Sequence, residues 1–267
     1  MTPVVLHLHG FKCAGSTFMW ILEKNFPKKV LYVESLIGDT RLDFQKVIPL
    51  LDKAKFKAIS SHLISRPHPH SLPLALTVTF LRNPSERLMS AYAFRKATQA
   101  LKAGDVNFTA FLTRLRVSPI ANYQTRLLSP QNWNLNGPRK GWELNPRAIN
   151  LNDENLFVGT VEMFDQSLVL LEQWFKDRGV DFDASYSVPR NTEIMQGTKK
   201  QEHWVHAIFP DMIDIDELLW REVTQRIESK MNLDLDFSDK MIDFARRREA
   251  VAGLEIPHKR PEQVVRL

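Results

Sequence analysis

The chain has 267 residues, of which 43% are hydrophobic and 25% charged, and it carries a formal net charge of +5. This length and composition predict a single α/β domain over 1–267 with an ample core, and one cysteine excludes an intrachain disulfide. The modest basic excess suits an anionic ligand; without a recognised nucleic-acid motif or a long apolar run, we expect neither nucleic acid nor membrane as a partner.

The first predicted elements are a buried strand and a phosphate-binding loop. Residues 4–8 form an apolar, β-branched run, and a helical pattern follows over 17–25. Between them, Gly10 and Gly15 have the spacing of a phosphate-binding loop, and Thr17 stands where that loop has its hydroxyl residue. Free backbone N–H groups and the helix dipole at such a junction favour a negatively charged ligand.

The lysine of this loop is displaced from its usual position. Ser16 stands where a lysine is normal, and the loop's own lysine is Lys12. An ammonium at Lys12, early in the loop, reaches a ligand from a different side than a lysine at the helix start would. This argues against an ordinary ATPase or GTPase. The alternative is a tight strand-to-helix turn with a solvated Lys12. Cys13 is expected to be modestly thiolate-prone, because it lies near a helix N-terminus.

Further strands are predicted over 30–33 and 56–59, with an amphipathic helix over 43–53 between them. The strand over 56–59 is expected to end at the same sheet edge as the phosphate loop. His62 follows this strand, which makes it a candidate for chemistry at that edge.

A buried parallel strand is predicted over 76–81, and Arg82 follows it. Ligands bind at the carboxyl ends of strands in open α/β sheets. A Walker-B strand would end in an aspartate that holds magnesium, whereas arginine offers a planar fork of donors that suits a phosphate. The alternative for Arg82 is a salt bridge at the strand end.

A helix is predicted directly after this strand. Asn83 is the expected N-cap, Pro84 the first helical residue and Glu86 the partner in a capping box. Ser90, two turns into the helix, can add a hydroxyl to an anion site. The chain therefore offers two separate anion sites.

The second half of the chain is predicted to be mostly helical. The expected elements are a strand at 157–161 and helices at 107–116, 119–128, 163–175, 202–209, 214–231 and 238–251. The polar segment 129–153 is a candidate lid or acceptor-binding loop, or an ordinary surface excursion. The tail 253–267 is predicted to be loose. The predicted fold class is α/β, with a P-loop-type parallel sheet flanked by helices and a helix-rich C-terminal half.

Two segments of the chain resemble the PAPS-dependent sulfotransferases, especially the branch that includes the heparan sulfate O-sulfotransferases. That branch typically shows His-x-Pro-Lys-Thr-Ala/Gly-Gly-Thr/Ser-Thr/Ser, and the matching residues are His9, Lys12, Ala14, Gly15, Ser16 and Thr17. Phe11 and Cys13 depart from its Pro and Thr. The family's 3′-phosphate motif is matched by Arg82, Asn83, Pro84, Arg87, Ser90 and Tyr92. With weaker similarities at 122–126 and 158–162, the resemblance covers residues 4–175.

The resemblance implies a co-substrate and a role for each motif. PAPS carries a 5′-phosphosulfate and a 3′-phosphate, so each motif would hold one end. The 5′ end would be held by Lys12, Cys13, Ala14, Gly15, Ser16 and Thr17, and the 3′ end by Arg82 and Ser90. Lys12 would also offset the charge that grows on the leaving phosphate, and no metal is implied. The acceptor is expected to be a hydroxyl of a carbohydrate or a small metabolite.

A general base is also expected, because an acceptor hydroxyl is a weak nucleophile. His62 is the candidate, since the heparan 2-O-sulfotransferase branch has a base histidine just upstream of the 3′-phosphate strand. His68 and His70 are the alternatives, and His62 can instead be a structural histidine. His7, within the first strand, is interpreted as a packed sheet residue.

Two other functions stay open at this point. One is a P-loop kinase of a small metabolite, for which Glu34 is the candidate magnesium carboxylate; the other is a non-catalytic adenine-nucleotide-binding scaffold. The N-terminus shows no signal-peptide pattern or apolar anchor. Because the animal glycan sulfotransferases are anchored in the Golgi, the resemblance then implies a soluble, cytoplasmic bacterial enzyme.

Overall fold

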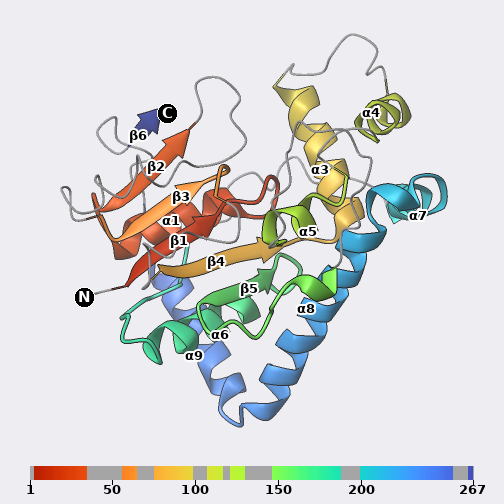
Figure 1. Cartoon of the computed structure of the whole chain (residues 1–267). Helices are drawn as coiled ribbons and strands as arrows, with labels where there is room; N and C mark the ends of the chain where they lie inside the picture. The colour runs from red at the N-terminus through yellow and green to blue at the C-terminus, as the bar shows by residue number, and fades with distance from the viewer. Residues whose placement is uncertain are drawn as a thin grey trace.

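The computed structural model describes residues 3–34, 56–64, 75–98, 107–116, 121–129, 146–187, 199–254 and 264–266. These residues contain a six-stranded sheet with the order β5-β4-β1-β3-β2-β6 (Figure 1). Every strand pair in it is parallel. The strands are β1 (Val4–Leu8), β2 (Val30–Glu34), β3 (Ala58–Ser61), β4 (Ala75–Leu81), β5 (Leu156–Thr160) and β6 (Val264–Arg266).

The alternation of side chains along β1 shows how the sheet is covered on both faces. Val5 packs into the cluster that contains α1 (Gly15–Asn25), α6 (Phe164–Lys176) and α9 (Phe237–Ala250). Leu6 and Leu8 pack on the opposite face with α5 (Tyr123–Leu128) and α8 (Asp214–Leu233). Strands buried on both faces read as continuous apolar runs, which is why the sequence pattern identified them.

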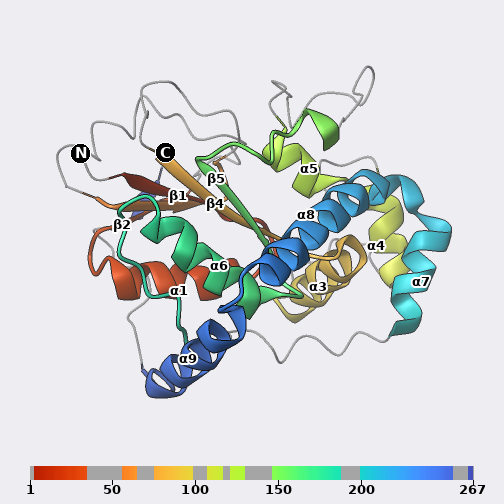
Figure 2. The same ribbon diagram turned by 90° about the horizontal axis from the view of Figure 1, so that it is seen from below.

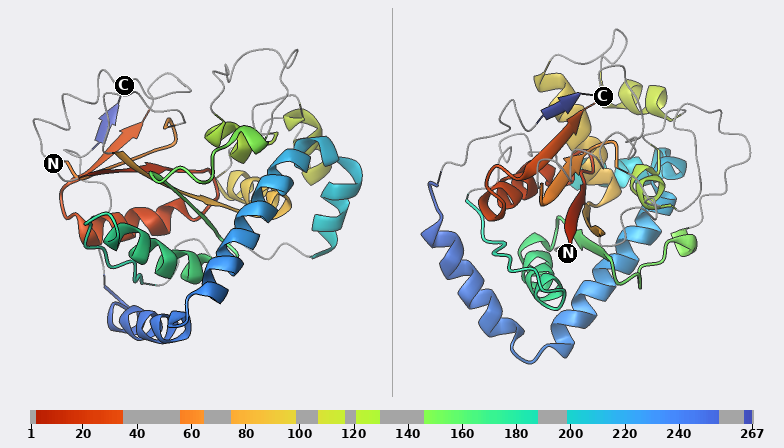
Figure 3. Two further views of the ribbon diagram at one scale, coloured as in Figure 1. Left: turned by 60° about the horizontal axis from the view of Figure 1, so that its bottom comes forward. Right: turned by 60° about the vertical axis from the view of Figure 1, so that its left-hand side comes forward.

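The helices form two layers and a lateral lobe. Figures 2 and 3 show α1 and α6 together on one side of the sheet, with α9 outside them. The lobe packs around its own apolar cluster and lies beside the ends of β4 and β5 in Figures 1 and 2. It consists of α3 (Pro84–Ala97), α4 (Phe108–Leu115) and α7 (Lys199–Ile208). Two 3₁₀ turns, η1 (Pro146–Ala148) and η3 (Pro210–Met212), complete the described elements.

The strand order determines where a ligand site is expected. From β1 the chain runs to β2 and β3 on one side of the sheet, and then crosses to β4 and β5 on the other. The loop after β1 therefore lies at the point where the strand order reverses, and crevices form at such points in open α/β sheets.

The predicted fold class is confirmed, and two details are corrected. The third strand begins at Ala58 and ends at Ser61 instead of spanning 56–59. The tail was expected to be loose, but Val264–Arg266 pair with Tyr32–Glu34 as an edge strand. Isolated from its partner, a three-residue strand has no recognisable pattern. The predicted helix over 43–53 and most of the candidate lid, 130–145, lie outside the described residues.

Candidate functional site

Three strand ends bring the candidate residues to one edge of the sheet. β1 is paired with both β3 and β4, and Leu8 is in register with Ser61. The residues that follow, His9 and His62, are therefore neighbours, and the His9 amide donates to the Ser61 carbonyl at 3.1 Å. Arg82 follows the adjacent β4. The predicted loop, Arg82 and His62 thus share the carboxyl edge of the sheet.

The orientation of His62 is defined by the loop. Its Nδ1 lies 2.5 Å from the His9 carbonyl oxygen, and its ring stacks on the His9 ring with centroids 3.9 Å apart. A carbonyl oxygen can only accept, so Nδ1 carries the proton and the neutral ring has its lone pair on Nε2. The side chain is exposed. This tautomer can accept a proton from a hydroxyl.

His7 has a structural environment, as the sequence interpretation expected. It is buried, and its Nδ1 lies 2.9 Å from the Ser60 hydroxyl. Burial, and secondarily the neighbouring His62, lowers the pKa of His7 to about 3. His7 is therefore neutral near pH 7.

The loop after β1 has the backbone of an anion-binding turn. Lys12 and Ala14 have φ values of 66° and 57°, and consecutive turns of this kind direct N–H groups toward one point. Ala14 is the N-cap of α1 and supplies no side-chain cap. The N–H groups of the first turn, which include those of Gly15 and Ser16, are thus left without a side-chain cap among the described residues. Thr17, in the same turn, is buried.

A glycine is needed at position 15 because the His9 ring lies close to its backbone. A Cβ at this position would lie 1.9 Å from atoms of the His9 ring, a distance that no side chain tolerates. The same His9 ring stacks on His62. Gly15 therefore makes room for the ring against which the candidate base rests.

Lys12 is half-buried, and its Nζ lies 4.6 Å from the centroid of the Phe94 ring. Burial lowers the pKa of Lys12, and the nearby Arg82 guanidinium lowers it further. Two cations held near each other favour an anion between them.

Arg82 is buried and is anchored through its main chain. Gln124 accepts from the Arg82 amide at 2.7 Å and donates to the Arg82 carbonyl at 2.8 Å. The guanidinium pairs with Glu86 at 3.3 Å and approaches the Lys12 carbonyl at 3.5 Å. The salt bridge considered as an alternative thus exists, and it holds the guanidinium beside the loop.

One face of α3 connects the two cations. Glu86, Ser90 and Phe94 are spaced four residues apart, so they share a helix face. Glu86 contacts Arg82, and Phe94 contacts Lys12. Two helical turns, about 12 Å, separate these contact points, and the buried Ser90 lies between them. Ser90 therefore lies on the helix face that meets the loop.

Two local expectations are wrong. Burial raises the pKa of Cys13 to about 12, so its thiol is not thiolate-prone; the buried neighbours outweigh the helix N-terminus. The capping box forms only in half. Asn83 accepts from the Ser85 and Glu86 amides, but its own amide donates to Glu162 at 2.7 Å instead of to Glu86.

The sequence motifs did not assign a role to several residues at this edge. Gln124 and Glu162 lie within the two weaker similarities and hold the main chain of Arg82 and Asn83. His9 supports His62. The ring positions of Phe11 and Phe94 had no sequence signal. His68 and His70 lie outside the described residues, as does the side chain of Glu34.

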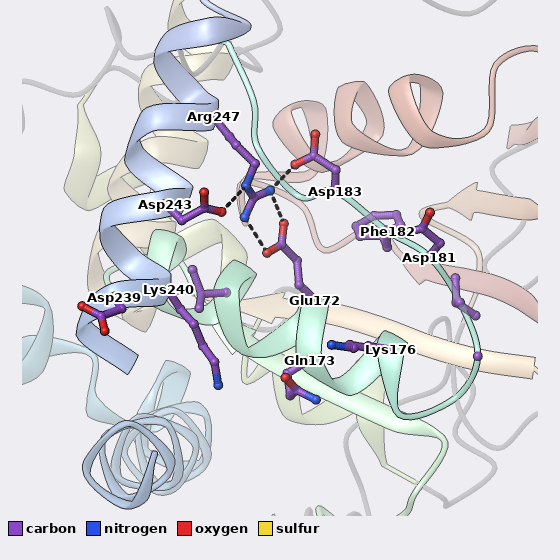
Figure 4. A pocket seen from close by; sticks show the side chains of 13 residues that line it. Glu172, Gln173, Lys176, Asp181, Phe182, Asp183, Asp239, Lys240, Asp243 and Arg247 are labelled. Carbon is purple, nitrogen blue, oxygen red and sulfur yellow. Dashed lines mark hydrogen bonds and ion pairs between the residues drawn. The ribbon is translucent and has the colours of Figure 1, made fainter. Parts of the chain in front are cut away.

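A large open cleft of about 970 Å³ lies elsewhere, between α6 and α9 (Figure 4). Arg247 reaches across it and pairs with Glu172 at 2.8 Å and with Asp243 at 2.8 Å; it also contacts Asp183. None of the candidate residues lines this cleft. The pair between Arg247 and Glu172 joins α9 to α6, which makes this side of the cleft a packing contact of the C-terminal helix.

Within the part of the chain that the structure describes, no helix combines the length and the apolar character that crossing a membrane requires. In the same residues, no three His, Cys, Asp or Glu side chains gather as metal ligands would.

Comparison with known proteins gives one relative by sequence and several similar structures. No family model matches the chain. An uncharacterized protein of Archaeoglobus fulgidus is 27% identical in an alignment 202 residues long, which covers 68% of this chain and 77% of that protein. A sulfotransferase from Alicyclobacillus acidocaldarius has a TM-score of 0.46 at 16% identity and covers 82% of this chain and 96% of its own. Mouse sulfotransferase SULT7A1 complexed with PAP has a TM-score of 0.46 at 14% identity, and the match covers 83% of this chain and 88% of the mouse protein.

Proposed function

We propose that this protein transfers a sulfuryl group from PAPS to an acceptor hydroxyl. The carrying observation is the arrangement at the sheet edge: Lys12 and Arg82 are neighbours that contact one face of α3 at two points, Phe94 and Glu86, and His62 follows the adjacent strand β3 with its proton on Nδ1. Two cations held together at the end of a sheet suit an anionic ligand such as a nucleotide that carries several phosphates. A base next to them suits the acceptance of a proton from a hydroxyl.

The chain's residues fit such a ligand at each end. The N–H groups after Ala14 and the Lys12 ammonium would hold the 5′-phosphosulfate, with the hydroxyls of Ser16 and Thr17. Arg82 and Ser90 would hold the 3′-phosphate. The like-charge interaction that lowers the pKa of Lys12 would be relieved when an anion binds, which supports an anionic ligand over a neutral one.

The proposed roles give the following transfer step. The acceptor oxygen forms a bond to sulfur while the bond from sulfur to the 5′-phosphate oxygen breaks, and this oxygen keeps the electron pair. His62 Nε2 takes the acceptor's proton. Lys12 offsets the charge on the leaving phosphate of 3′,5′-ADP. The step depends on positioning and charge stabilisation, as phosphoryl transfer does.

Thermal unfolding with two ligands tests the function. We expect 3′,5′-ADP to raise the melting temperature without any divalent cation, because a ligand that binds only the native state stabilises it. ATP with magnesium is the comparison. A larger shift with ATP and magnesium would instead support the kinase, and equal shifts would contradict a dedicated 3′-phosphate site.

A transfer assay then separates the enzyme from a non-catalytic scaffold. Labelled PAPS is incubated with a mixture of aromatic, aliphatic and sugar alcohols, and we expect label in at least one of them. The Lys12→Ala variant is the control and should abolish transfer. Binding of 3′,5′-ADP without transfer to any alcohol would support the scaffold.

A further inference from the structure

Side chains hold the main chain between β4 and α3. β4 ends at Leu81, so the main-chain groups that follow need partners from outside the strand. Gln124 accepts from the Arg82 amide at 2.7 Å and donates to the Arg82 carbonyl at 2.8 Å, and Glu162 accepts from the Asn83 amide at 2.7 Å. The Arg82 carbonyl and the Asn83 N–H belong to one planar peptide group. Gln124 and Glu162 therefore hold this peptide at both of its polar ends.

The register of the sheet places Glu162 beside this peptide. Leu81 of β4 is in register with Thr160 of β5, and the Val161 amide donates to the Leu81 carbonyl at 2.8 Å. Glu162 is the next residue, so its carboxylate reaches the start of α3. It is exposed, and the apolar clusters of the described residues do not include it. Glu162 therefore acts there through hydrogen bonds and not through core packing.

Helix α8 anchors both of the side chains that hold the peptide. Glu162 accepts from the Asn83 amide through Oε1, and its Oε2 accepts from Nε1 of Trp220 at 2.9 Å. Asp216 accepts from the main-chain amide of Gln124 at 3.0 Å. Asp216 and Trp220 are four residues apart, so they share one face of α8, and α8 lies against β5 (Figure 1). One helix face thus supports Gln124 and Glu162 together.

The direction of the Arg82 guanidinium depends on this support. The guanidinium ends a long, flexible side chain, so the main chain decides which positions it can reach. Its ion-pair partner at 3.3 Å is Glu86 of α3, and Glu162 holds the amide of Asn83, the N-cap of that helix. Glu162 therefore fixes both the root of the Arg82 side chain and the start of the helix that carries Glu86. A displacement of a binding group by about 1 Å can have a large effect on function.

We propose that Glu162 is a positioning residue for the recognition of the 3′-phosphate. Anchored by Trp220, it fixes the peptide after Arg82 and thereby the direction of the guanidinium. The inference rests on the proposed function, in which Arg82 binds the 3′-phosphate. Glu162 has the same sign of charge as a phosphate, so it acts through the main chain of Arg82 and not by contact with the ligand.

Titration calorimetry with 3′,5′-ADP and 5′-AMP tests the inference, because these ligands differ only in the 3′-phosphate. Glu162→Ala should weaken the binding of 3′,5′-ADP about tenfold, the contribution of about one hydrogen bond, and that of 5′-AMP less than about twofold. Trp220→Phe keeps an aromatic ring but removes the N–H donor, and it should weaken only 3′,5′-ADP, by about threefold. Trp174→Phe is the matched control: Trp174 is also half-buried, but it lies on α6, and its replacement should change neither affinity.

A double-mutant cycle with Arg82→Ala separates positioning from general support of the fold. Without the guanidinium, Glu162 has nothing to direct. The double variant should therefore bind 3′,5′-ADP within about twofold of Arg82→Ala alone, because residues that act as one unit are not additive. If Glu162 only supports the fold, its loss should instead multiply with that of Arg82→Ala.

The outcomes separate the inference from the proposed function. If Glu162→Ala leaves both affinities unchanged, weakens both ligands equally, or adds its full effect to that of Arg82→Ala, Glu162 is not a positioning residue and the nucleotide site stands. If the wild type binds 3′,5′-ADP no more tightly than 5′-AMP, the 3′-phosphate site of the proposed function fails, and the inference fails with it. An unchanged affinity for 5′-AMP shows that a variant is folded. If Glu162→Ala does not fold, the same comparison of the two ligands in Trp220→Phe decides.

Discussion

At the scale of single residues, Lys12 and Arg82 are expected to serve opposite ends of one ligand, since their side chains meet α3 two turns apart. Arg82→Ala should weaken 3′,5′-ADP binding by about 1.5–3 kcal/mol, the range for a hydrogen bond to a charged group. It should change the affinity for adenosine 5′-phosphosulfate, which lacks the 3′-phosphate, much less. Lys12→Ala should weaken the binding of both ligands. Titration calorimetry measures each, and equal losses in Arg82→Ala would mean that Arg82 only supports the fold.

The tautomer of His62 makes it the expected base. His62→Ala should lower kcat by roughly 10²–10⁴-fold and leave 3′,5′-ADP affinity near that of the wild type. The acid limb of the rate profile should also disappear, because protonation of Nε2 removes the lone pair. His206→Ala, which changes an exposed histidine on α7, should leave kcat unchanged. An undiminished kcat in His62→Ala would redirect attention to His68 and His70.

His7 should make the protein less stable in acid. Its folded pKa of about 3 is below the unfolded value near 6.5, so the unfolded chain binds the proton first. The stabilising contribution is fully present above about pH 6.5 and is lost as the pH falls toward 3; between pH 8 and pH 5 the loss is about 2 kcal/mol. Urea unfolding at both pH values, with His7→Asn as the comparison, measures it. Between pH 8 and pH 5 the variant should lose less stability than the wild type. An identical pH dependence in the two proteins would contradict the lowered pKa of His7.

At the scale of elements, α5 and α8 cap each other. The buried Asp216 of α8 accepts from the Gln124 amide at 3.0 Å and the Thr125 amide at 2.7 Å. Asn122, before α5, accepts from the Ile215 and Asp216 amides at 3.1 Å. Since Gln124 holds the main chain of Arg82, this pair of caps connects the second half of the chain to the site.

Loss of the Asp216 cap should therefore affect stability and binding together. Asp216→Asn should lower the free energy of unfolding by about 2–3 kcal/mol, because a buried charged acceptor is lost. A smaller loss of 3′,5′-ADP affinity should accompany it. Asp211→Asn, which disrupts an exposed pair with Arg116, should cost less than about 1 kcal/mol. Urea unfolding compares the two variants, and equal effects would refute the capping role.

At the scale of the whole molecule, the sheet extends further from the site than the sequence indicated. β6 is paired with β2 at the end of the sheet, while the candidate residues follow β1, β3 and β4. Deletion of residues 264–267 should lower the free energy of unfolding by roughly 1–3 kcal/mol, the contribution of a few backbone hydrogen bonds. The affinity for 3′,5′-ADP should not change. Lost nucleotide binding in a folded truncation would show that this edge contributes to the site.

The sequence by itself determined the strands β1 and β4, the position of the first loop and the helix after Arg82. Strands covered on both faces must be apolar throughout, and Asn83-Pro84 suits a helix start whatever surrounds it. These features depend on neighbours in the chain. For the same reason, the phosphate-loop spacing and the position of Arg82 at a strand end could be interpreted without a structure.

Only the tertiary structure decided what the side chains of the site contact. The tautomer of His62 depends on the carbonyl of His9, which follows the neighbouring strand β1. Three further features arise from contacts between distant segments. They are the burial of the Cys13 thiol, the acceptance of the Asn83 amide by Glu162 where Glu86 was expected, and the position of the Phe11 ring beside His62. Local patterns carry no information about such contacts, because burial and charge at a point are set by every element that packs there.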